Sequence, residues 1–210
     1  LEQKPGKLTF ELKGQRLRAI YHMIETKSGD WLAVLSDDKR DAPDPMPDLD
    51  PMLCGQETEA FDDNAWAFEP IIKGTRLFAV CSDSTRLMNG DEDVTVGYKE
   101  LSSVGKNLVA IDAIVDAVAS GPAGRTTLCA FDLIYLDGKS LMKSPYDERR
   151  HLLEQIVVPS ERLQLVVAAQ AEGKAFAQTA FAQGFETIVA KKLDSSYASG
   201  KSAFWRLIRS

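Results

Sequence analysis

Two apolar, strand-like segments lie only four residues apart in the sequence, and this pattern constrains the fold more than any other feature. Residues 67–72 read AFEPII, the chain continues with Lys73-Gly74-Thr75-Arg76, and the apolar run resumes with LFAV. A glycine between two apolar runs is typical of a tight turn between paired strands. We therefore predict strands at 66–72 and 75–81. Three roles remain open for Lys73: a nucleophile, a phosphate ligand or a solvated turn residue.

The remaining pattern predicts a mixed fold with more strands than helices. Ser144-Pro145 precedes Asp147-Glu148 and leucines at helical spacing, so we expect Ser144 to be the N-cap of a helix and Pro145 its first residue. A second helix is expected at 173–184 and a short third helix at 98–105. Further apolar runs predict strands at 84–88, 108–116, 127–135, 163–168 and 187–191. The expected class is α+β.

Composition narrows the kind of protein. The chain has 210 residues, of which 44% are hydrophobic and 27% charged, and these values suit one globular domain or one domain with an appendage. Its three cysteines lie far apart and it has only two histidines, so neither a disulfide framework nor a histidine-based metal site is expected. The sequence lacks both an apolar run of about 18 residues and the apolar core of a secretory signal. We expect a cytoplasmic protein with reduced thiols and no membrane partner, and the missing initiator Met suggests a fragment of a longer protein.

Three regions differ in character. Residues 1–36 contain the strand-like segments LTFEL, AIYHMIE and DWLAVL, which predict a small β unit. Residues 37–52, DDKRDAPDPMPDLDPM, are rich in Asp and Pro and predict an extended linker. Residues 53–210 carry the other predicted elements and are expected to form the main domain.

The charge is unevenly distributed. A net charge of −6 argues against a dedicated nucleic-acid binder. The last twenty residues nevertheless contain a single acid, Asp194, and a strip of five cations: Lys191, Lys192, Lys201, Arg206 and Arg209. Such a strip can contact phosphate even in an acidic chain, so DNA is a candidate partner, with weak and salt-dependent binding expected.

Three segments follow one another in a recognisable order: EPIIKGTR at 69–76, CAFDLIYLDG at 129–138 and FETIVAKKLDSSYASGKSAFWRLIR at 185–209. Together with ERRHLLE, they resemble the adenylation (nucleotidyltransferase) domain of ATP-dependent DNA ligases of the bacterial end-joining type, over residues 46–210. The resemblance implies an ATP-grasp-like DNA ligase nucleotidyltransferase fold, in which antiparallel sheets with flanking helices enclose a nucleotide cleft. Residues 1–36 resemble the tail of the phosphoesterase module that precedes the ligase module in such proteins, without its metal-binding histidines.

In that family a lysine attacks the α-phosphate of ATP, and the AMP is then passed to the 5′-phosphate of nicked DNA. The lysine belongs to the pattern E-x-K-x-D-G-x-R. Glu69, Gly74 and Arg76 match this pattern, but Ile71 stands in the place of the lysine and Lys73 in the place of the aspartate. Because isoleucine has no lone pair, the resemblance implies that this chain cannot form lysyl–AMP in the family's register.

Other family elements are altered as well. The D-G-E element is read as Asp112-Ala113-Ile114, without the last carboxylate. The element E-G-x-x-x-K keeps its acid and its lysine but has Thr187 in place of glycine, and W-x-K-x-K keeps Trp205 but has Leu207 and Arg209 in place of the lysines. These departures imply that no residue is catalytic and that binding of ATP and Mg²⁺ is weak or lost.

The surviving matches define the candidate site. By resemblance, the nucleotide-binding candidates are Glu69, Arg76, Phe131, Lys191 and Arg209, and the candidate metal ligand is Glu186. Phe131 matches the aromatic residue that stacks on adenine, although its place in an apolar strand favours a core position. A salt bridge explains Arg76 equally well, and solvent exposure explains the C-terminal cations and Glu186.

Three functions are therefore open. The first is a catalytically inactive ligase-like domain, a pseudoenzyme that binds or scaffolds in DNA end repair beside other end-joining proteins. The second is an active ATP-dependent DNA ligase or adenylyltransferase that uses Lys73. The third is a structural remnant within a multidomain end-joining protein. The loss of the nucleophile favours the first.

Overall fold

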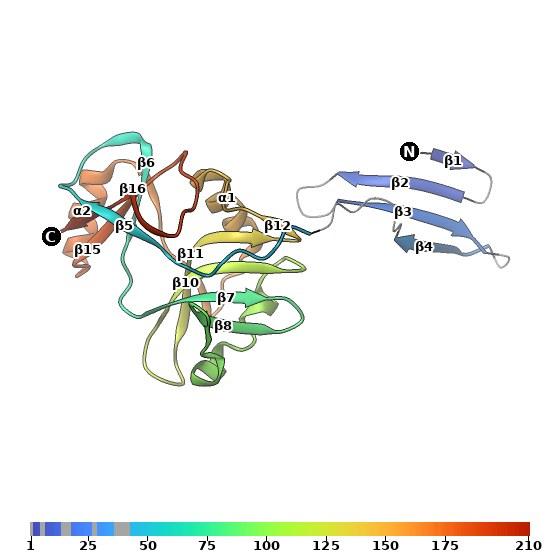
Figure 1. Ribbon diagram of the computed structural model, residues 1–210, viewed down its shortest axis with the longest axis horizontal. Helices are drawn as coiled ribbons and strands as arrows, with labels where there is room; N and C mark the ends of the chain where they lie inside the picture. Colours follow the sequence, from blue (N-terminus) through green and yellow to red (C-terminus); the bar gives the residue numbers. More distant parts are fainter. Residues whose placement is uncertain (1, 5–6, 14–17, 27–28, 36–42) are drawn as a thin grey trace. The chain divides into compact units, whose positions relative to one another are not determined.

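The structure, a computed structural model, describes residues 2–4, 7–13, 18–26, 29–35 and 43–210 (Figure 1). The chain divides into two units, Leu1–Asp44 and Pro45–Ser210, and each is described by itself. No helix in these described stretches is long and apolar enough to cross a membrane.

The first unit is an antiparallel sheet whose four strands follow the order of the sequence. The strands are β1 (Glu2–Lys4), β2 (Lys7–Lys13), β3 (Arg18–Glu25) and β4 (Trp31–Leu35). Phe10 of β2 is opposite Tyr21 of β3, and their rings stack with centroids 5.7 Å apart. The three strands predicted in residues 1–36 are thereby confirmed. Residues 37–42 of the predicted linker lie outside the described residues.

A seven-stranded sheet forms one half of the second unit, in the order β12-β11-β10-β7-β8-β9 with β13 paired to β11. All pairs are antiparallel except β11–β13. The strands are β7 (Thr75–Cys81), β8 (Thr85–Asn89), β9 (Glu92–Asp93), β10 (Ala113–Ser120), β11 (Thr127–Leu136), β12 (Lys139–Ser140) and β13 (Leu163–Leu165).

A five-stranded sheet forms the other half, in the order β14-β6-β15-β16-β5. Only β16 and β5 run parallel. The strands are β5 (Met52–Glu57), β6 (Asp63–Pro70), β14 (Ala169–Ala171), β15 (Thr187–Lys192) and β16 (Gly200–Arg209). The predicted strands 66–72 and 75–81 therefore exist as β6 and β7, but they join different sheets and do not pair with each other.

The helices lie on the outer faces of the two sheets. Buried apolar side chains of α1 (Tyr146–Ile156) and of the 3₁₀ helices η1 (Thr95–Leu101) and η2 (Val104–Asn107) pack on the seven-stranded sheet. Helix α2 (Gly173–Ala182) packs its alanines on Trp66, Phe68 and Ile188 of the five-stranded sheet. A third cluster, with Phe78, Phe131 and Trp205, lies between the two sheets. Figure 1 shows α2 beside β15 and β16, and α1 near β11. This layering confirms the α+β class.

Several predicted boundaries were wrong for local reasons. The strand expected at 108–116 begins at Ala113, because the backbone N–H groups of Ile111 and Asp112 donate to the Asp137 carboxylate before the strand starts. The N-cap of α1 is Pro145, not Ser144, and it makes no side-chain capping bond. The helix expected at 98–105 is two 3₁₀ helices, the first broken at Tyr98 by a non-helical φ of −132°.

The edge of the five-stranded sheet begins inside the predicted linker. Met52 is fully buried and starts β5, and Leu49 packs against the core between the sheets. A Cβ atom on Gly55 would lie 2.6 Å from the carbonyl oxygen of Ser202, so a glycine lets β5 approach β16 at this point. The sequence MLCGQE alternates too little between apolar and polar residues to signal this strand.

Candidate functional site

The turn that follows β6 carries the substituted family motif. Ile71 continues the strand, since its N–H donates to the carbonyl of Thr187, and Ile71 and Ile72 both pack against the core between the sheets. A Cβ atom on Gly74 would overlap the carbonyl oxygen of Ala119. The glycine is therefore needed where the turn passes over β10, and not only for the bend itself.

Lys73 is a surface residue of this turn. Its side chain is 75% exposed, and its ammonium lies 2.6 Å from a carboxylate oxygen of Glu186, which is 69% exposed. The hydrogen bond and charge of Lys73 lower the pKa of Glu186. The predicted metal ligand thus faces a cation. The described residues hold no group of three or more His, Cys, Asp or Glu side chains that could bind a metal ion.

Glu69 and Lys191 form a buried ion pair between the two sheets. Glu69 of β6 and Lys191 of β15 are each 1% exposed, and Lys191 Nζ lies 2.6 Å from Glu69 Oε2. The hydroxyl of Tyr146 donates to the other oxygen of Glu69. Burial and the negative charge of Glu69 raise the pKa of Tyr146 well above its usual value. Both charged groups therefore have partners within the protein.

Arg76 and Asp116 form a second pair. Arg76 Nε and Nη2 donate to the two oxygens of Asp116 at 2.9 and 2.6 Å, which is the bidentate geometry that favours guanidinium–carboxylate pairs. Tyr197 donates its hydroxyl to Asp116 at 2.6 Å, and Arg76 Nη1 donates to the carbonyl of Met52. Burial lowers the pKa of Arg76, but the charges and hydrogen bonds of Asp116 and Tyr197 together raise it above its usual value.

Phe131 lies between these two pairs. Its ring is 4.6 Å from Lys191 Nζ and 5.2 Å from the guanidinium carbon of Arg76, and the Trp205 ring meets it edge-on at 6.2 Å. The residue is only 9% exposed. Cations and an indole thus contact the ring on which adenine would stack, so Phe131 is a core residue with cation–π neighbours.

A third buried pair completes the cluster and was missed from the sequence. Arg149 of α1 donates from Nε and Nη2 to both oxygens of Asp132, at 2.8 and 2.9 Å, and both side chains are fully buried. Its guanidinium carbon lies 5.6 Å from the ring centroids of Tyr146 and Tyr197. The only available signal was the presence of both residues in the motif segments FDLIYLDG and ERRHLLE.

The pairing of Arg76 also bears on the D-G-E element. Asp112 accepts from the N–H of Gly138 at a turn, whereas Asp116 faces Arg76 in the buried cluster. Asp112, the first residue of the predicted element, therefore lies at a turn and not in this cluster. Its third residue, Ile114, is buried in the core between the sheets.

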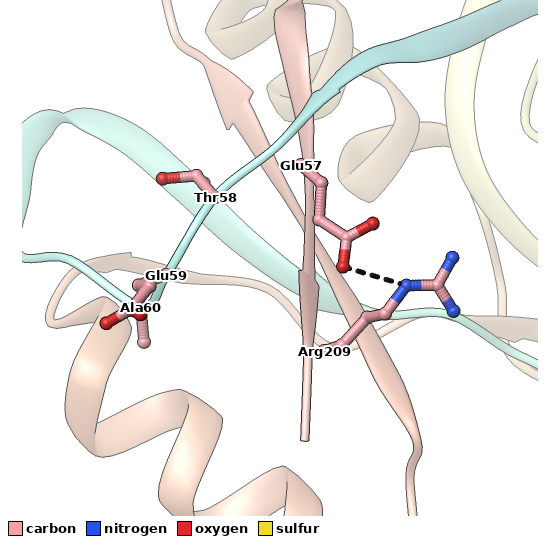
Figure 2. Close-up of a pocket in the computed structure, with 5 residues that line it drawn as sticks. All are labelled: Glu57, Thr58, Glu59, Ala60 and Arg209. Atoms are coloured by element: carbon pink, nitrogen blue, oxygen red, sulfur yellow. Dashed lines mark ion pairs between the residues drawn. The ribbon is translucent and has the colours of Figure 1, made fainter.

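Arg209 lies apart from this cluster. It is on the last strand, 59% exposed, and its Nε lies 3.0 Å from Glu57. Figure 2 shows the two side chains directed toward each other beside an open pocket of about 450 Å³, which is also lined by Thr58, Glu59 and Ala60. The two glutamates give this pocket a negative charge. Of the predicted nucleotide-binding residues, the structure therefore brings together Glu69, Arg76, Phe131 and Lys191 but not Arg209.

Comparison with known proteins agrees with the motifs. Residues 99–208, just over half of the chain, match the family model of the ATP dependent DNA ligase domain. The multifunctional non-homologous end joining protein LigD of Mycolicibacterium smegmatis is 29% identical over 224 residues, which cover 95% of this chain and 28% of that protein. A DNA ligase of Thermococcus fumicolans is 43% identical over 74 residues, 33% of this chain and 13% of its own.

Two solved structures share the fold. A mycobacterial DNA ligase D complexed with ATP and MES matches with a TM-score of 0.67 and 28% identity, over 77% of this chain and 60% of that one. The ligase domain of M. tuberculosis LigD matches with a TM-score of 0.65, 28% identity and coverage of 77% and 59%. The predicted nucleotidyltransferase fold is thereby confirmed. The chain spans less than a third of the length of the LigD relatives.

Proposed function

Because the chain belongs to the family of ATP-dependent DNA ligase domains, we propose that it is a ligase-like adenylation domain that no longer adenylates itself and that binds or scaffolds in DNA end repair. The observation that carries this proposal is the buried cluster of paired charges. Ile71 stands where the nucleophile belongs, and Lys191 and Arg76, the cations that would meet the nucleotide, are held by Glu69 and Asp116.

The residues present do not fit ATP and Mg²⁺. A stacked adenine needs a free face of Phe131, and phosphates need cations that are not already neutralised. We expect ATP to bind no more tightly than about millimolar, which corresponds to about −4 kcal/mol. Any remaining nucleotide contacts would fall to Glu69, Arg76, Phe131 and Lys191 only after their buried pairs open. Arg209 and Glu186 would contribute little, because each faces an opposite charge at the surface.

Incubation with ATP and Mg²⁺ or Mn²⁺, followed by intact-mass measurement, tests the proposal. We expect no AMP-sized mass gain. A gain that disappears in Lys73→Ala would instead establish an adenylyltransferase that uses Lys73. Calorimetric titration with ATP addresses the remaining alternative, because a domain that keeps a weak nucleotide site gives measurable heat at millimolar ATP and a purely structural remnant gives none. Micromolar affinity for ATP would show that the nucleotide site has not been lost.

We propose DNA and other end-joining proteins as the partners, in the cytoplasm of a bacterium. Support comes from the relatives, which are named as multifunctional non-homologous end joining proteins. The exposed members of the C-terminal strip are the candidates for phosphate contact. Lys191 leaves this set because it is buried.

For the first unit we propose a role as part of another module, as its resemblance to the tail of a phosphoesterase module implies. Its sheet carries an exposed cross-strand pair, Ile24 and Leu32, at 43% and 56% exposure. A single sheet with apolar groups exposed is stable only when another layer covers it. Expression of this unit alone and hydrogen exchange on it would test whether it folds without that layer.

A further inference from the structure

An exposed aromatic side chain lies among cations on the last strand. Phe204 is 46% exposed, whereas its neighbour Trp205 is 3% exposed and belongs to the core between the sheets. The two aromatic residues lie in the bulge where β16 shifts register against β5, between Ser202 and Arg206. Trp205 therefore anchors the bulge, and Phe204 presents much of its ring to solvent.

One cation lies beside this ring, and a second lies further along the strand that carries the ring. Lys192 Nζ lies 5.6 Å from the centroid of the Phe204 ring, and Lys201 is exposed three residues earlier on the same strand. Lys192 also lies 3.1 Å from Asp194, so Lys192, Lys201 and Asp194 together carry one net positive charge. Leu53, which is opposite Lys201 on β5, is 42% exposed and extends the apolar part of the surface. We refer to Leu53, Lys192, Lys201 and Phe204 as the Phe204 patch.

A ring with a cation beside it and a second cation further along the strand matches the chemistry of a short stretch of single-stranded nucleic acid. A base can stack on the exposed face of the ring, a phosphate beside that base can meet Lys192, and a phosphate further along can meet Lys201. In a duplex the bases are already stacked on each other, so the ring is useful only to a base that is unpaired. A nicked duplex offers no such base, whereas a DNA end with a single-stranded overhang does.

We propose that the Phe204 patch binds unpaired nucleotides of single-stranded DNA at a broken end. This inference rests on the proposed role in DNA end repair and adds the kind of DNA structure that is recognised. Stacking on one aromatic residue alters affinity by about 5- to 150-fold per base. Because the whole chain has a net charge of −6, the binding is weak and requires low salt for detection.

Fluorescence anisotropy at low salt with the whole chain tests the proposal. The probes are a labelled single strand of about ten nucleotides, a blunt hairpin duplex and the same hairpin with a single-stranded tail. We expect the single strand and the tailed hairpin to bind more tightly than the blunt hairpin. Phe204→Ala should remove most of that preference and Phe204→Trp should keep it. Val96→Ala, a change at an even more exposed apolar residue on η1, should have no effect.

Several outcomes would overturn the inference. These are equal binding of the blunt and tailed hairpins, no binding of the single strand, an unchanged affinity in Phe204→Ala, or a stronger preference for RNA of the same sequence. Urea unfolding of each variant checks that the fold is intact. The adenylation test is independent of this one: an AMP adduct would refute the loss of catalysis, whereas failure of the patch would leave that proposal untouched.

Discussion

Lys191 and Glu69 lie 2.6 Å apart, Nζ to Oε2, with both side chains almost completely buried. A charge removed from water costs several kcal/mol, and only a well-placed partner offsets that cost. The interface between the sheets also holds the bidentate Arg76–Asp116 contact and the Arg149–Asp132 contact. In each of the three pairs, the positive charge is thus neutralised by a carboxylate within the protein.

The first prediction concerns this pair. Lys191→Met should destabilise the protein by about 3–5 kcal/mol, because it leaves the carboxylate of Glu69 buried without its main partner. Glu69→Gln should destabilise the Lys191→Met variant much less than it destabilises the parent protein, since the double variant leaves no unpaired charge. Urea unfolding of both single variants and of the double variant gives the coupling.

The exposed pair Lys73–Glu186 supplies the matched control. Its two side chains are largely in solvent, so removing either should change the unfolding midpoint little. If the effects of Lys191→Met and Glu69→Gln are simply additive, the two residues do not act as a pair and the account of the filled site is wrong.

The second prediction is that restoring the nucleophile alone does not restore catalysis. Ile71→Lys places an amine where the family has one, but Phe131 stays covered by cations and the third residue of the D-G-E element stays apolar. We expect no AMP adduct after incubation with ATP and Mg²⁺, as judged by intact mass. An adduct in Ile71→Lys that persists in Ile71→Lys/Lys73→Ala would mean that the cleft still accepts the nucleotide.

Local patterns predicted the strands and not the charge pairs, for a physical reason. Strand β7 occupies the predicted residues 75–81, and β11 differs from its prediction by one residue, because a short, nearly continuous apolar run carries its own signal. Arg76 meets Asp116 from forty positions away, on a different strand. Whether a matched arginine serves a ligand or a salt bridge depends on tertiary packing. Similarly, β5 joins β16 only through a non-local parallel pairing.

The third prediction separates the members of the C-terminal cationic strip. Lys201→Gln should weaken binding to single-stranded DNA and reduce the dependence of log affinity on log salt by about one unit, as expected for the loss of one phosphate contact. Arg209→Gln should leave both quantities unchanged, because Arg209 is paired with Glu57 beside a negatively charged pocket. DNA titrations at three salt concentrations measure both quantities. A smaller salt dependence in Arg209→Gln would mean that Arg209 contacts phosphate, as predicted from the sequence.

The fourth prediction is a loss of stability in alkali that depends on Cys81. Burial raises the pKa of this thiol from 9.0 to about 11, partly offset by a hydrogen bond with Thr85. In the unfolded chain the proton leaves near pH 9, while the folded chain keeps it until about pH 11. Between these values the folded state binds more protons, so stability falls as pH rises. The shift corresponds to a loss on the order of 2 kcal/mol across this window.

Cys81→Ala isolates this contribution from the other alkaline titrations. The buried tyrosines Tyr146 and Tyr197 also have raised pKa values, but they are present in both proteins and cancel in the difference. The variant should be less stable than the parent at pH 8, because it leaves a small cavity in the core. That difference should shrink between pH 9 and 11, where only the parent loses the contribution of the thiol. Urea unfolding curves whose difference stays constant over this range would show that burial does not hold the proton on Cys81.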